Sequence, residues 1–589
     1  MMGRSTFTPR RKRWERITWW YSGIFGVAVV ALLLKLIISG DDPVDGVRGV
    51  VRDAYSGDPI GGANVATLNA TAMTGDDGSF VVSDTTATTV TISREDYASA
   101  QVQVADPDST IAVALIPTTI RGTVTHSRSK EPLEGIEIVA TTPGAAEVTT
   151  VSDADGNWAL EGVATGATIT ARFEGQTVGT VVLGANADLA FQIRPDVMTG
   201  TIRSSDGTPV PGAIVQVGDL TTTSNSDGTF RLVAVPEQGD IEVRKAGFHA
   251  ATGTVSASLT FDATLEQFSV RALYATALTV GNSVAWPELL NIADTTEINA
   301  MVVDLKDSSG QVFFDTQVPL AAQLGAKNVL YDVEAVVAQL KSKNIYSIAR
   351  IVVFEDPILA DARPDLSIMD STTGSAWTTF NGLAWVNAHE REVWQYNIDL
   401  AVEAANLGFD EIQLDYIRFP SDGVLENADY GPEFADETRL QAITGFLERM
   451  QTALRPTGAL LAIDIFGLTM WDDGDGGIGQ NFEAMAPFVD VVCPMIYPSH
   501  FNPGDLGLDI PNNHPYDVIK MSLDAGAERV PDAAGKLRPW LQDFSYGEGI
   551  EYGDAEVAAQ IQASDDAGAH GWMLWSPGNV YHDGALRRE

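Results

Sequence analysis

Asp415 is the residue in this sequence best placed to do acid–base chemistry. It lies near the end of Glu411–Phe419, where polar and apolar side chains alternate as in a half-exposed strand, and the turn signal Pro420–Gly423 follows. The alternation places Gln413 on the same face of the strand as Asp415. A single aspartate could equally cap a helix or pair with Arg418, so only further acidic residues nearby would indicate a catalytic site.

The segments around this strand predict the elements that would position it. Helix-like runs at Trp394–Leu407 and Glu437–Leu454 flank it, which indicates an α-β-α repeat. From residue 269 onward, apolar strand-like runs alternate with amphipathic stretches, and eight such runs over the domain 269–589 predict a (β/α)₈ TIM barrel. The eight predicted strands are Val270–Leu278, Ile298–Lys306, Tyr346–Phe354, Glu411–Phe419, Leu460–Phe466, Val491–Tyr497, Arg538–Phe544 and Gly571–Trp575. A doubly wound open sheet is the alternative, but no glycine-rich phosphate loop follows the first strand.

A second aspartate, Asp464, lies inside the apolar fifth strand, next to the strand of Asp415. A buried carboxyl group is costly unless it is paired or used, so two of them on neighbouring strands indicate a catalytic site. Adjacent strands lie about 4.8 Å apart, and carboxyl groups at that spacing suit a retaining glycosidase. Asp415 as nucleophile and Asp464 as general acid/base is the direct assignment, and the reverse assignment stays open.

The other strand ends carry aromatic and polar side chains that could stack on sugar rings or bind hydroxyl and carboxylate groups. The predicted substrate-binding residues are Asp304, Lys306, Asp356, Gln413, Arg418, Tyr497, His500, Trp540, Gln542 and Trp575. The chain has only seven histidines, and it contains neither a His-Glu-x-x-His nor a Gly-x-Ser-x-Gly motif. We therefore expect neither a metal nor a cofactor.

Residues 46–268 predict three β-sandwich repeats, at 46–117, 118–195 and 196–268. In each repeat a glycine opens the first strand, and an Asp-Gly turn is followed two residues later by an aromatic residue that could fill the sandwich core. These turns run Asp77–Phe80, Asp155–Trp158 and Asp227–Phe230.

The amino terminus differs from the rest of this acidic chain, whose formal net charge is −42. A basic tail, residues 1–16, precedes an apolar segment, residues 17–38, which is long enough to span a bilayer. The positive-inside rule then predicts a single-pass cell-membrane protein with the tail in the cytoplasm and the rest outside it. A cleaved signal peptide is the alternative. The net charge argues against a nucleic-acid partner, and the single cysteine, Cys493, is expected to be a buried structural thiol.

The three repeats resemble the carboxypeptidase-regulatory-like, or transthyretin-like, β-sandwich family. The resemblance implies a spacer, or a module that binds carbohydrate or protein. No cluster of aromatic or acidic residues marks a ligand site in the repeats, which favours the spacer.

Residues 270–585 resemble a bacterial family of glycoside hydrolases that is related to the alpha-amylase-type barrel. The resemblance rests on the segments Gly408–Ser421, Ala349–Phe354, Asp464–Gly467, Pro494–His500 and Arg538–Asp543. It implies that Asp415 is the nucleophile, Asp464 the proton donor and Asp543 a third acid. The wider clan has arginine at the position of Gln413 and glutamate at that of Asp464. Alternation also places Asp543 on the opposite strand face from Trp540 and Gln542.

The sequence therefore predicts a membrane-anchored glycoside hydrolase that cleaves a polysaccharide outside the cytoplasm, with three β-sandwich modules between the membrane and the barrel. The alternative is a non-catalytic glycan-binding or cell-envelope scaffold protein that has kept the barrel cleft.

Overall fold

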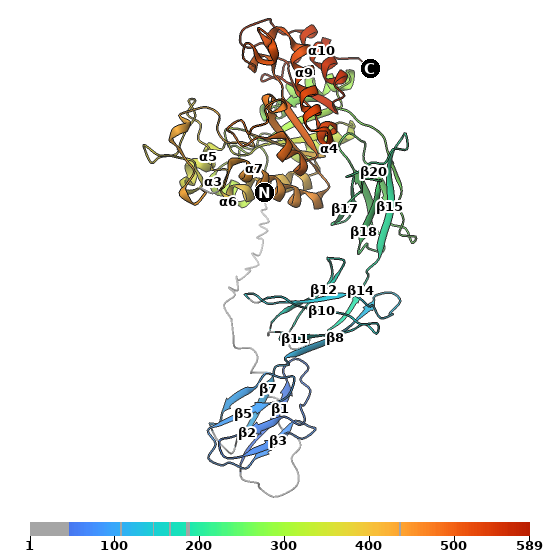
Figure 1. Ribbon diagram of the computed structural model, residues 1–589, viewed down its shortest axis with the longest axis vertical. Helices are drawn as coiled ribbons and strands as arrows, with labels where there is room; N and C mark the ends of the chain where they lie inside the picture. Colours follow the sequence, from blue (N-terminus) through green and yellow to red (C-terminus); the bar gives the residue numbers. More distant parts are fainter. Residues whose placement is uncertain are drawn as a thin grey trace, which may run out of the picture.

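Three small β-sandwich modules follow one another along the chain and lead to a large carboxyl-terminal barrel domain (Figure 1). The computed structural model describes residues 46–105, 109–144, 146–163, 166–183, 189–434 and 437–588. The predicted transmembrane segment, 17–38, lies outside these residues. Among the helices that the structure describes, none is both long and apolar enough to cross a membrane.

All three modules have the same topology. Each pairs a three-stranded sheet with a four-stranded sheet, and the first strand is the centre of the smaller sheet, antiparallel to the fourth strand and parallel to the last. The strands of module 1 are β1 Val47–Asp53, β2 Asn64–Ala66, β3 Thr71–Met73, β4 Ser79–Val82, β5 Thr89–Ser93, β6 Ala100–Gln103 and β7 Thr110–Leu115. Those of module 2 are β8 Thr119–His126, β9 Glu137–Thr141, β10 Val148–Val151, β11 Asn157–Glu161, β12 Thr168–Phe173, β13 Gln176–Val182 and β14 Ala190–Ile193. Those of module 3 are β15 Val197–Ser204, β16 Ile214–Val217, β17 Leu220–Thr223, β18 Thr229–Val233, β19 Asp240–Arg244, β20 Ala251–Thr254 and β21 Ala263–Leu265.

The repeated glycine and the repeated aromatic residue form a cross-strand pair in every module. In module 2, Gly122 of β8 lies directly opposite Trp158 of β11, whose side chain is buried. A Cβ atom on Gly122 would lie 2.4 Å from the Trp158 ring and 2.3 Å from the Leu189 carbonyl oxygen. The corresponding pairs are Gly49 with Phe80 and Gly200 with Phe230. The pattern seen in the sequence is thus a packing requirement, because the aromatic ring occupies the space that a side chain at the glycine would fill.

The carboxyl-terminal domain is a closed barrel of eight parallel strands, which confirms the predicted fold. All eight predicted strands are present: β22 Val270–Ala275, β23 Ala300–Lys306, β24 Tyr346–Val352, β26 Glu411–Asp415, β28 Leu460–Phe466, β29 Val491–Met495, β30 Trp540–Gln542 and β31 Gly571–Trp575. β31 pairs with β22 and closes the barrel. The two short strands β25 Met369–Asp370 and β27 Ala428–Asp429 pair outside it.

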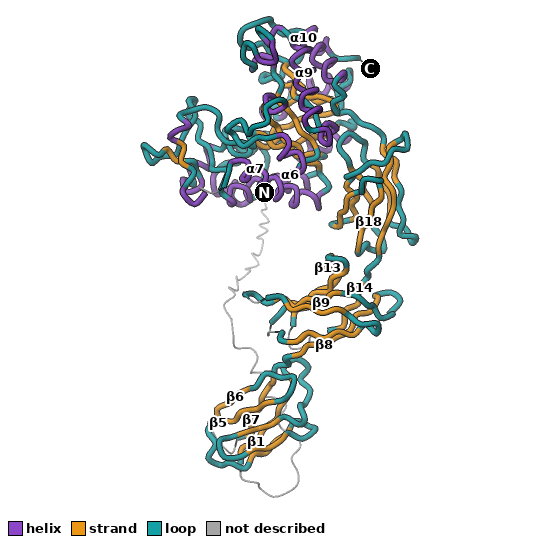
Figure 2. Tube along the Cα trace, viewed as in Figure 1, coloured by secondary structure: helices purple, strands orange, loops and turns teal. Residues whose placement is uncertain are grey.

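Helices surround the barrel, whereas the described parts of the modules consist of strands and loops (Figure 2). The helices are α1 Ala277–Val280, α2 Ala285–Thr295, α3 Pro319–Leu324, α4 Val333–Ser342, α5 Pro357–Ala362, α6 Arg391–Asn406, α7 Arg439–Leu454, α8 Phe482–Met485, α9 Pro515–Arg529 and α10 Asp554–Asp566. Their apolar faces pack against the outer faces of the strands. The inside of the barrel is filled by a second cluster, which includes Cys493. Cys493 is fully buried, as expected of a structural thiol.

β26 is shorter than its sequence predicts. The alternating pattern runs to Phe419, but the strand ends at Asp415, because Tyr416 adopts a left-handed backbone conformation with φ of 51°. The Tyr416 N–H donates to Asp415 Oδ1 over 2.6 Å and stabilises this kink. The kink resets the alternation, so Asp415, Tyr416 and Arg418 all line the same pocket while Ile417 is buried.

Module 3 docks onto the end of the barrel where the strands begin. Gln216 Nε2 donates to the Pro456 carbonyl oxygen over 2.6 Å, and Arg244 Nη1 donates to the Gly458 carbonyl oxygen over 3.3 Å. A crevice of about 370 Å³ at this junction is lined by Tyr346 and other residues at the strand starts. The opposite end of the barrel is therefore not covered by module 3.

Candidate active site

Asp415 lies at the carboxyl end of β26, on the floor of a pocket. Its Oδ2 accepts hydrogen bonds from Arg350 Nε at 3.0 Å and from Arg350 Nη2 at 2.5 Å, while Oδ1 accepts from Tyr416 N–H. Three donors, two of them on one guanidinium, suit an ionised carboxylate. Asp415 is 5% exposed, and that exposed part lines the pocket.

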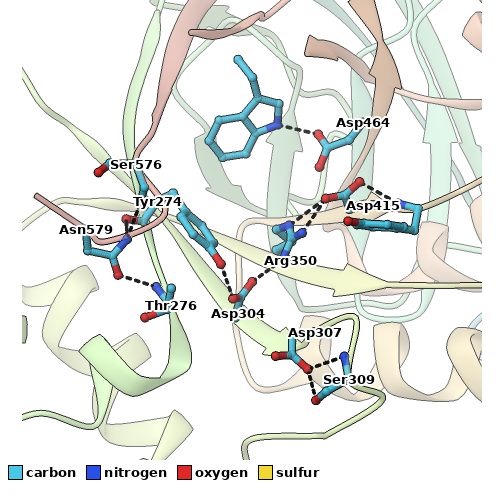
Figure 3. A network of polar contacts seen from close by, with 12 residues as sticks. Tyr274, Thr276, Asp304, Asp307, Ser309, Arg350, Asp415, Asp464, Ser576 and Asn579 are labelled. Carbon is cyan, nitrogen blue, oxygen red and sulfur yellow. Dashed lines mark hydrogen bonds and ion pairs between the residues drawn. The ribbon is translucent and has the colours of Figure 1, made fainter. Parts of the chain in front are cut away.

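Arg350 on β24 connects Asp415 to a second acid, Asp304 on β23 (Figure 3). Asp304 lies opposite Arg350 in the strand register and accepts from Arg350 Nη1 over 2.6 Å. The hydroxyl group of Tyr274 donates to the other Asp304 oxygen over 2.5 Å. The Tyr274 ring stacks on Trp575 with 4.0 Å between ring centroids. Arg350 is thereby fixed between two carboxylates and beneath two aromatic rings, which holds Asp415 in one orientation.

Asp464 lies on β28 beside Asp415, one residue beyond the paired positions Leu414 and Ile463. Its Oδ1 accepts from the Trp540 indole N–H over 2.7 Å, whereas its Oδ2 is buried without a hydrogen-bond partner among the described residues. Burial, and then the negative charge of Asp415, raise the pKa of Asp464 well above its usual value. Asp464 therefore favours its neutral form, whereas its neighbour Asp415 is held by the Arg350 guanidinium.

The pocket above these carboxyl groups has a volume of about 440 Å³, large enough for one or two sugar rings. Six of the predicted site residues line it: Asp415, Arg418, Tyr497, His500, Trp540 and Trp575. Aromatic side chains that were not predicted also line it, namely Tyr416, Phe466, Trp471 and Phe501. Burial lowers the pKa of His500, so its imidazole favours the neutral form.

Three further predicted residues are buried next to the pocket rather than in its wall. Two of them are the acids Asp464 and Asp304 described above. Asp304 forms an ion pair with Arg350 and does not face the pocket. Gln413 points into the barrel interior, where its Nε2 approaches Met573 Sδ at 3.5 Å and its Oε1 has no partner among the described residues. The shared face of Gln413 and Asp415 is thus the interior face of β26.

The remaining predicted site residues do not line the pocket. Lys306 and Asp356 form a buried ion pair of 2.8 Å, and Asp356 also caps α5 by accepting from Leu359 N–H. Gln542 donates to the Phe544 carbonyl oxygen and accepts from Ser499 N–H. These contacts stabilise the loops after the strands. Since the polar groups bond to one another, they are not available to bind a ligand.

Asp543, the possible third acid, is turned away from the pocket. It accepts from the backbone N–H of His582 over 3.1 Å and contacts His582 Nδ1 at 2.5 Å. This agrees with its place on the opposite strand face from Trp540 and Gln542. Its structural role is to attach the segment after β31 to β30.

Arg350 was missed as a functional residue, although the sequence contains a signal for it. It stands inside the apolar run Ala349–Phe354, where a charged side chain is as costly as Asp464 is in its own strand. Within the described part of the chain, no group of three His, Cys, Asp or Glu side chains is arranged to hold a metal ion.

The closed parallel barrel and the paired carboxyl groups at its strand ends are characteristic of barrel enzymes that work by acid–base chemistry. Residues 272–581 match the family described as "Putative glycosyl hydrolase domain". Because this match covers more than half of the 589 residues, the chain belongs to that family. Residues 119–194 and 197–269 each match the carboxypeptidase regulatory-like domain. Module 1 has the same topology, although it lies outside those matches.

Several solved structures are similar to part of this chain. A hypothetical protein from Ruminiclostridium thermocellum is 34% identical over 33% of this chain and 96% of its own, with a TM-score of 0.30. The PgaB (BpsB) glycoside hydrolase domain from Bordetella bronchiseptica is 12% identical over 54% of this chain and 99% of its own, with a TM-score of 0.40. A chitinase from Chromobacterium violaceum is 14% identical over 54% of this chain and 96% of its own, with a TM-score of 0.34. No curated protein matches the chain.

Proposed function

We propose that the barrel hydrolyses glycosidic bonds of a polysaccharide, with Asp415 as nucleophile and Asp464 as general acid/base. The observation that carries the proposal is the contrast between two neighbouring carboxyl groups. Asp464 is buried with a raised pKa and one oxygen without a partner among the described residues, whereas Asp415 is held by a guanidinium at the pocket floor. One proton donor beside one carboxylate is what glycoside hydrolysis requires.

In the first step, Asp464 donates its proton to the glycosidic oxygen while Asp415 attacks the anomeric carbon. The carbon–oxygen bond to the leaving sugar breaks, and a glycosyl ester to Asp415 forms. In the second step, the Asp464 carboxylate takes a proton from water, the hydroxide attacks the anomeric carbon, and Asp415 is released as a carboxylate. Arg350 holds the Asp415 carboxyl group in place for its attack, and its positive charge favours the release of Asp415 as a carboxylate in the second step.

Two substitutions in the full chain test this assignment. Asp415→Asn and Asp464→Asn should each reduce the release of new reducing ends from a panel of α- and β-linked polysaccharides by about 10³-fold or more. Asp524→Asn is the matched control, since it removes an exposed carboxylate on α9 that pairs only with Lys520. Retention of activity by either site variant would refute the catalytic pair.

The anomeric outcome provides a separate test of the retaining mechanism. Nucleophilic attack by Asp415 followed by attack of water inverts the anomeric centre twice. Proton NMR of the first product formed should therefore show the anomer of the substrate. The opposite anomer would mean that Asp415 activates water instead of attacking the sugar.

Glycan binding without hydrolysis is a second candidate function, favoured by the burial of Asp464. Asp464 is 1% exposed and does not itself line the pocket, and its Oδ1 already accepts a hydrogen bond from the Trp540 indole. In this case a glycan would bind to the full chain and to Asp415→Asn alike, and no polysaccharide on the panel would release reducing ends.

The amino-terminal sequence supports a membrane-anchored location for this activity. The basic tail 1–16 and the apolar segment 17–38 precede three modules that would hold the barrel away from a bilayer. The full chain should sediment with membranes and be released by detergent but not by high salt. Protease added to intact cells should cleave the modules; their protection would place them in the cytoplasm and refute the proposed topology.

A further inference from the structure

The pocket contains a positively charged group, the guanidinium of Arg418, that pairs with no carboxylate of the described residues. This side chain is 9% exposed and lines the pocket together with Asp415. It reaches the pocket because the kink at Tyr416 turns the chain after β26. Arg418 is thus held on the same segment as the proposed nucleophile, three residues along the chain.

Aromatic rings, rather than acids, surround Arg418. The guanidinium carbon lies 4.9 Å from the Trp385 ring centroid, 5.0 Å from that of Tyr416 and 4.7 Å from that of Phe466. Its Nη1 donates to the Phe419 carbonyl oxygen over 3.0 Å. Cation–π contacts fix the plane of the guanidinium, but they do not neutralise its charge.

The other two arginines buried in the barrel are neutralised. Arg350 pairs with Asp304 and Asp415, and Arg538 pairs with Glu411. Arg418 has no carboxylate within ion-pairing distance among the described residues. A buried charge is costly unless it is paired, so an unpaired arginine in the wall of a pocket indicates that its partner is a ligand.

Among the acids that attract Arg418, Asp415 has the largest effect but pairs with Arg350, and Glu355 comes next. Burial raises the pKa of Glu355 to about 7, because it outweighs the attraction of Arg418, and Asp422 and Asp415 raise it further. Glu355 therefore favours its neutral form more than an ordinary glutamate does. The positive charge of Arg418 stays largely available to the pocket.

We propose that Arg418 determines specificity by binding an anionic substituent, a carboxylate or a sulfate ester, on the sugar in the pocket. The substrate class is then an acidic polysaccharide. This inference rests on the proposed function for the nature of the reaction, but it concerns what is bound rather than what is cleaved. The net charge of −42 increases the need for such a residue. An acidic polymer is repelled by most of this surface and needs a local cation to bind.

Matched acidic and neutral oligosaccharides test the inference by binding. Suitable pairs are oligogalacturonides with their methyl esters, C6-oxidised with unmodified cello-oligosaccharides, and sulfated with desulfated carrageenan fragments. Binding to the full chain is measured by tryptophan fluorescence in the Asp415→Asn background, so that no ligand is consumed. We expect the acidic member of at least one pair to bind about tenfold or more tightly than its neutral match, and less tightly as salt increases. The pair that responds distinguishes carboxylate from sulfate recognition.

Substitutions then assign the preference to one side chain. Arg418→Gln should weaken binding of the acidic ligand about tenfold or more and change that of the neutral match less than about twofold. Arg418→Lys keeps the charge without the planar fork and should give an intermediate loss. Arg449→Gln, which removes a positive charge from an exposed position on α7, is the matched control. The circular dichroism and melting temperature of each variant establish that it folds.

The results also separate this inference from the proposed hydrolysis. Equal binding of both members in every pair, binding of no acidic probe, or equal weakening of both members by Arg418→Gln would overturn the role of Arg418. Acid-selective binding by a wild-type chain that releases no reducing ends would support Arg418 and refute hydrolysis. Cleavage of a neutral polysaccharide that Arg418→Gln does not affect would support hydrolysis and refute the role of Arg418.

Discussion

At the scale of single residues, the candidate site depends on how buried charges are matched. Arg350 is shared by Asp304 and Asp415, while Asp464 receives only one neutral donor, the Trp540 indole. Ionising both of two adjacent carboxyl groups is unfavourable, because their negative charges repel each other. Burial and the charge of Asp415, together with the single neutral donor, leave the proton on Asp464.

The proton on Asp464 predicts the alkaline side of the pH–rate profile. Burial and the charge of Asp415 raise the pKa of Asp464, so its acid form is present below that raised pKa and is lost as pH rises through it. Hydrolysis should therefore fall at alkaline pH.

An aryl glycoside of the cleaved sugar with an activated leaving group needs no acid to protonate that group. Asp464→Asn should therefore form the glycosyl ester from it at near wild-type rate, whereas Asp415→Asn should not. Equal loss in both variants would contradict the division of roles.

Loss of Arg350 should destabilise the barrel as well as inactivate it. Arg350→Ala leaves Asp304 and Asp415 buried without their shared cation, which costs about 3–5 kcal/mol in the free energy of unfolding. Urea denaturation followed by barrel tryptophan fluorescence measures this cost. Arg363→Ala is the control, because its ion pairs with Asp365 and Glu392 lie on the surface, and it should cost about 1 kcal/mol or less.

The sequence predicted individual acids better than their partners. Asp415 stood out because it lies near the carboxyl end of a predicted barrel strand, and Asp464 because a charged residue in an apolar strand needs an explanation. Lys306 and Asp356 were predicted as site residues because they are polar residues at strand ends, yet they neutralise each other, and only the packing of the loop after β24 against β23 shows it. Arg350 was not singled out, because its role depends on a register that pairs it with Asp304 across the sheet.

At the scale of elements, strand positions followed from the sequence while strand ends did not. Alternation and apolar runs located all eight barrel strands, since each must be buried on both faces. The end of β26 depends on a left-handed residue, Tyr416, which few sequence signals predict for an aromatic side chain. Without that kink, Arg418 would face away from Asp415, so the difference of four residues decides the composition of the pocket.

The glycine–aromatic pairs predict a localised effect on the modules. Gly122→Ala places a methyl group against both the Trp158 ring and a backbone oxygen, so module 2 should lose about 1–3 kcal/mol or more of stability. Thr123→Ala, on the exposed face of the same strand, is the control. Differential scanning calorimetry should show a lower transition for module 2 and an unchanged transition for the barrel. A shift of every transition would mean that the modules unfold with the barrel.

At the scale of the whole molecule, polar contacts join module 3 to the barrel, and a crevice lies at their junction. Replacing both Gln216 and Arg244 by alanine should weaken docking by about 1–2 kcal/mol, since two hydrogen bonds are lost. Faster hydrogen exchange of amides in β17 and at 455–457 would report this. The control is Gln192→Ala, which removes a hydrogen bond to Lys130 within module 2. Unchanged exchange in the double variant would show that docking does not depend on these contacts.

The docking of module 3 at the strand starts also determines which end of the barrel a ligand can reach. The pocket opens at the strand ends, on the side of the barrel opposite the junction crevice, so a polymer can approach it without passing the modules. The barrel lies at the end of the row of modules, so the number of modules determines its distance from the first strand of module 1 (Figure 1).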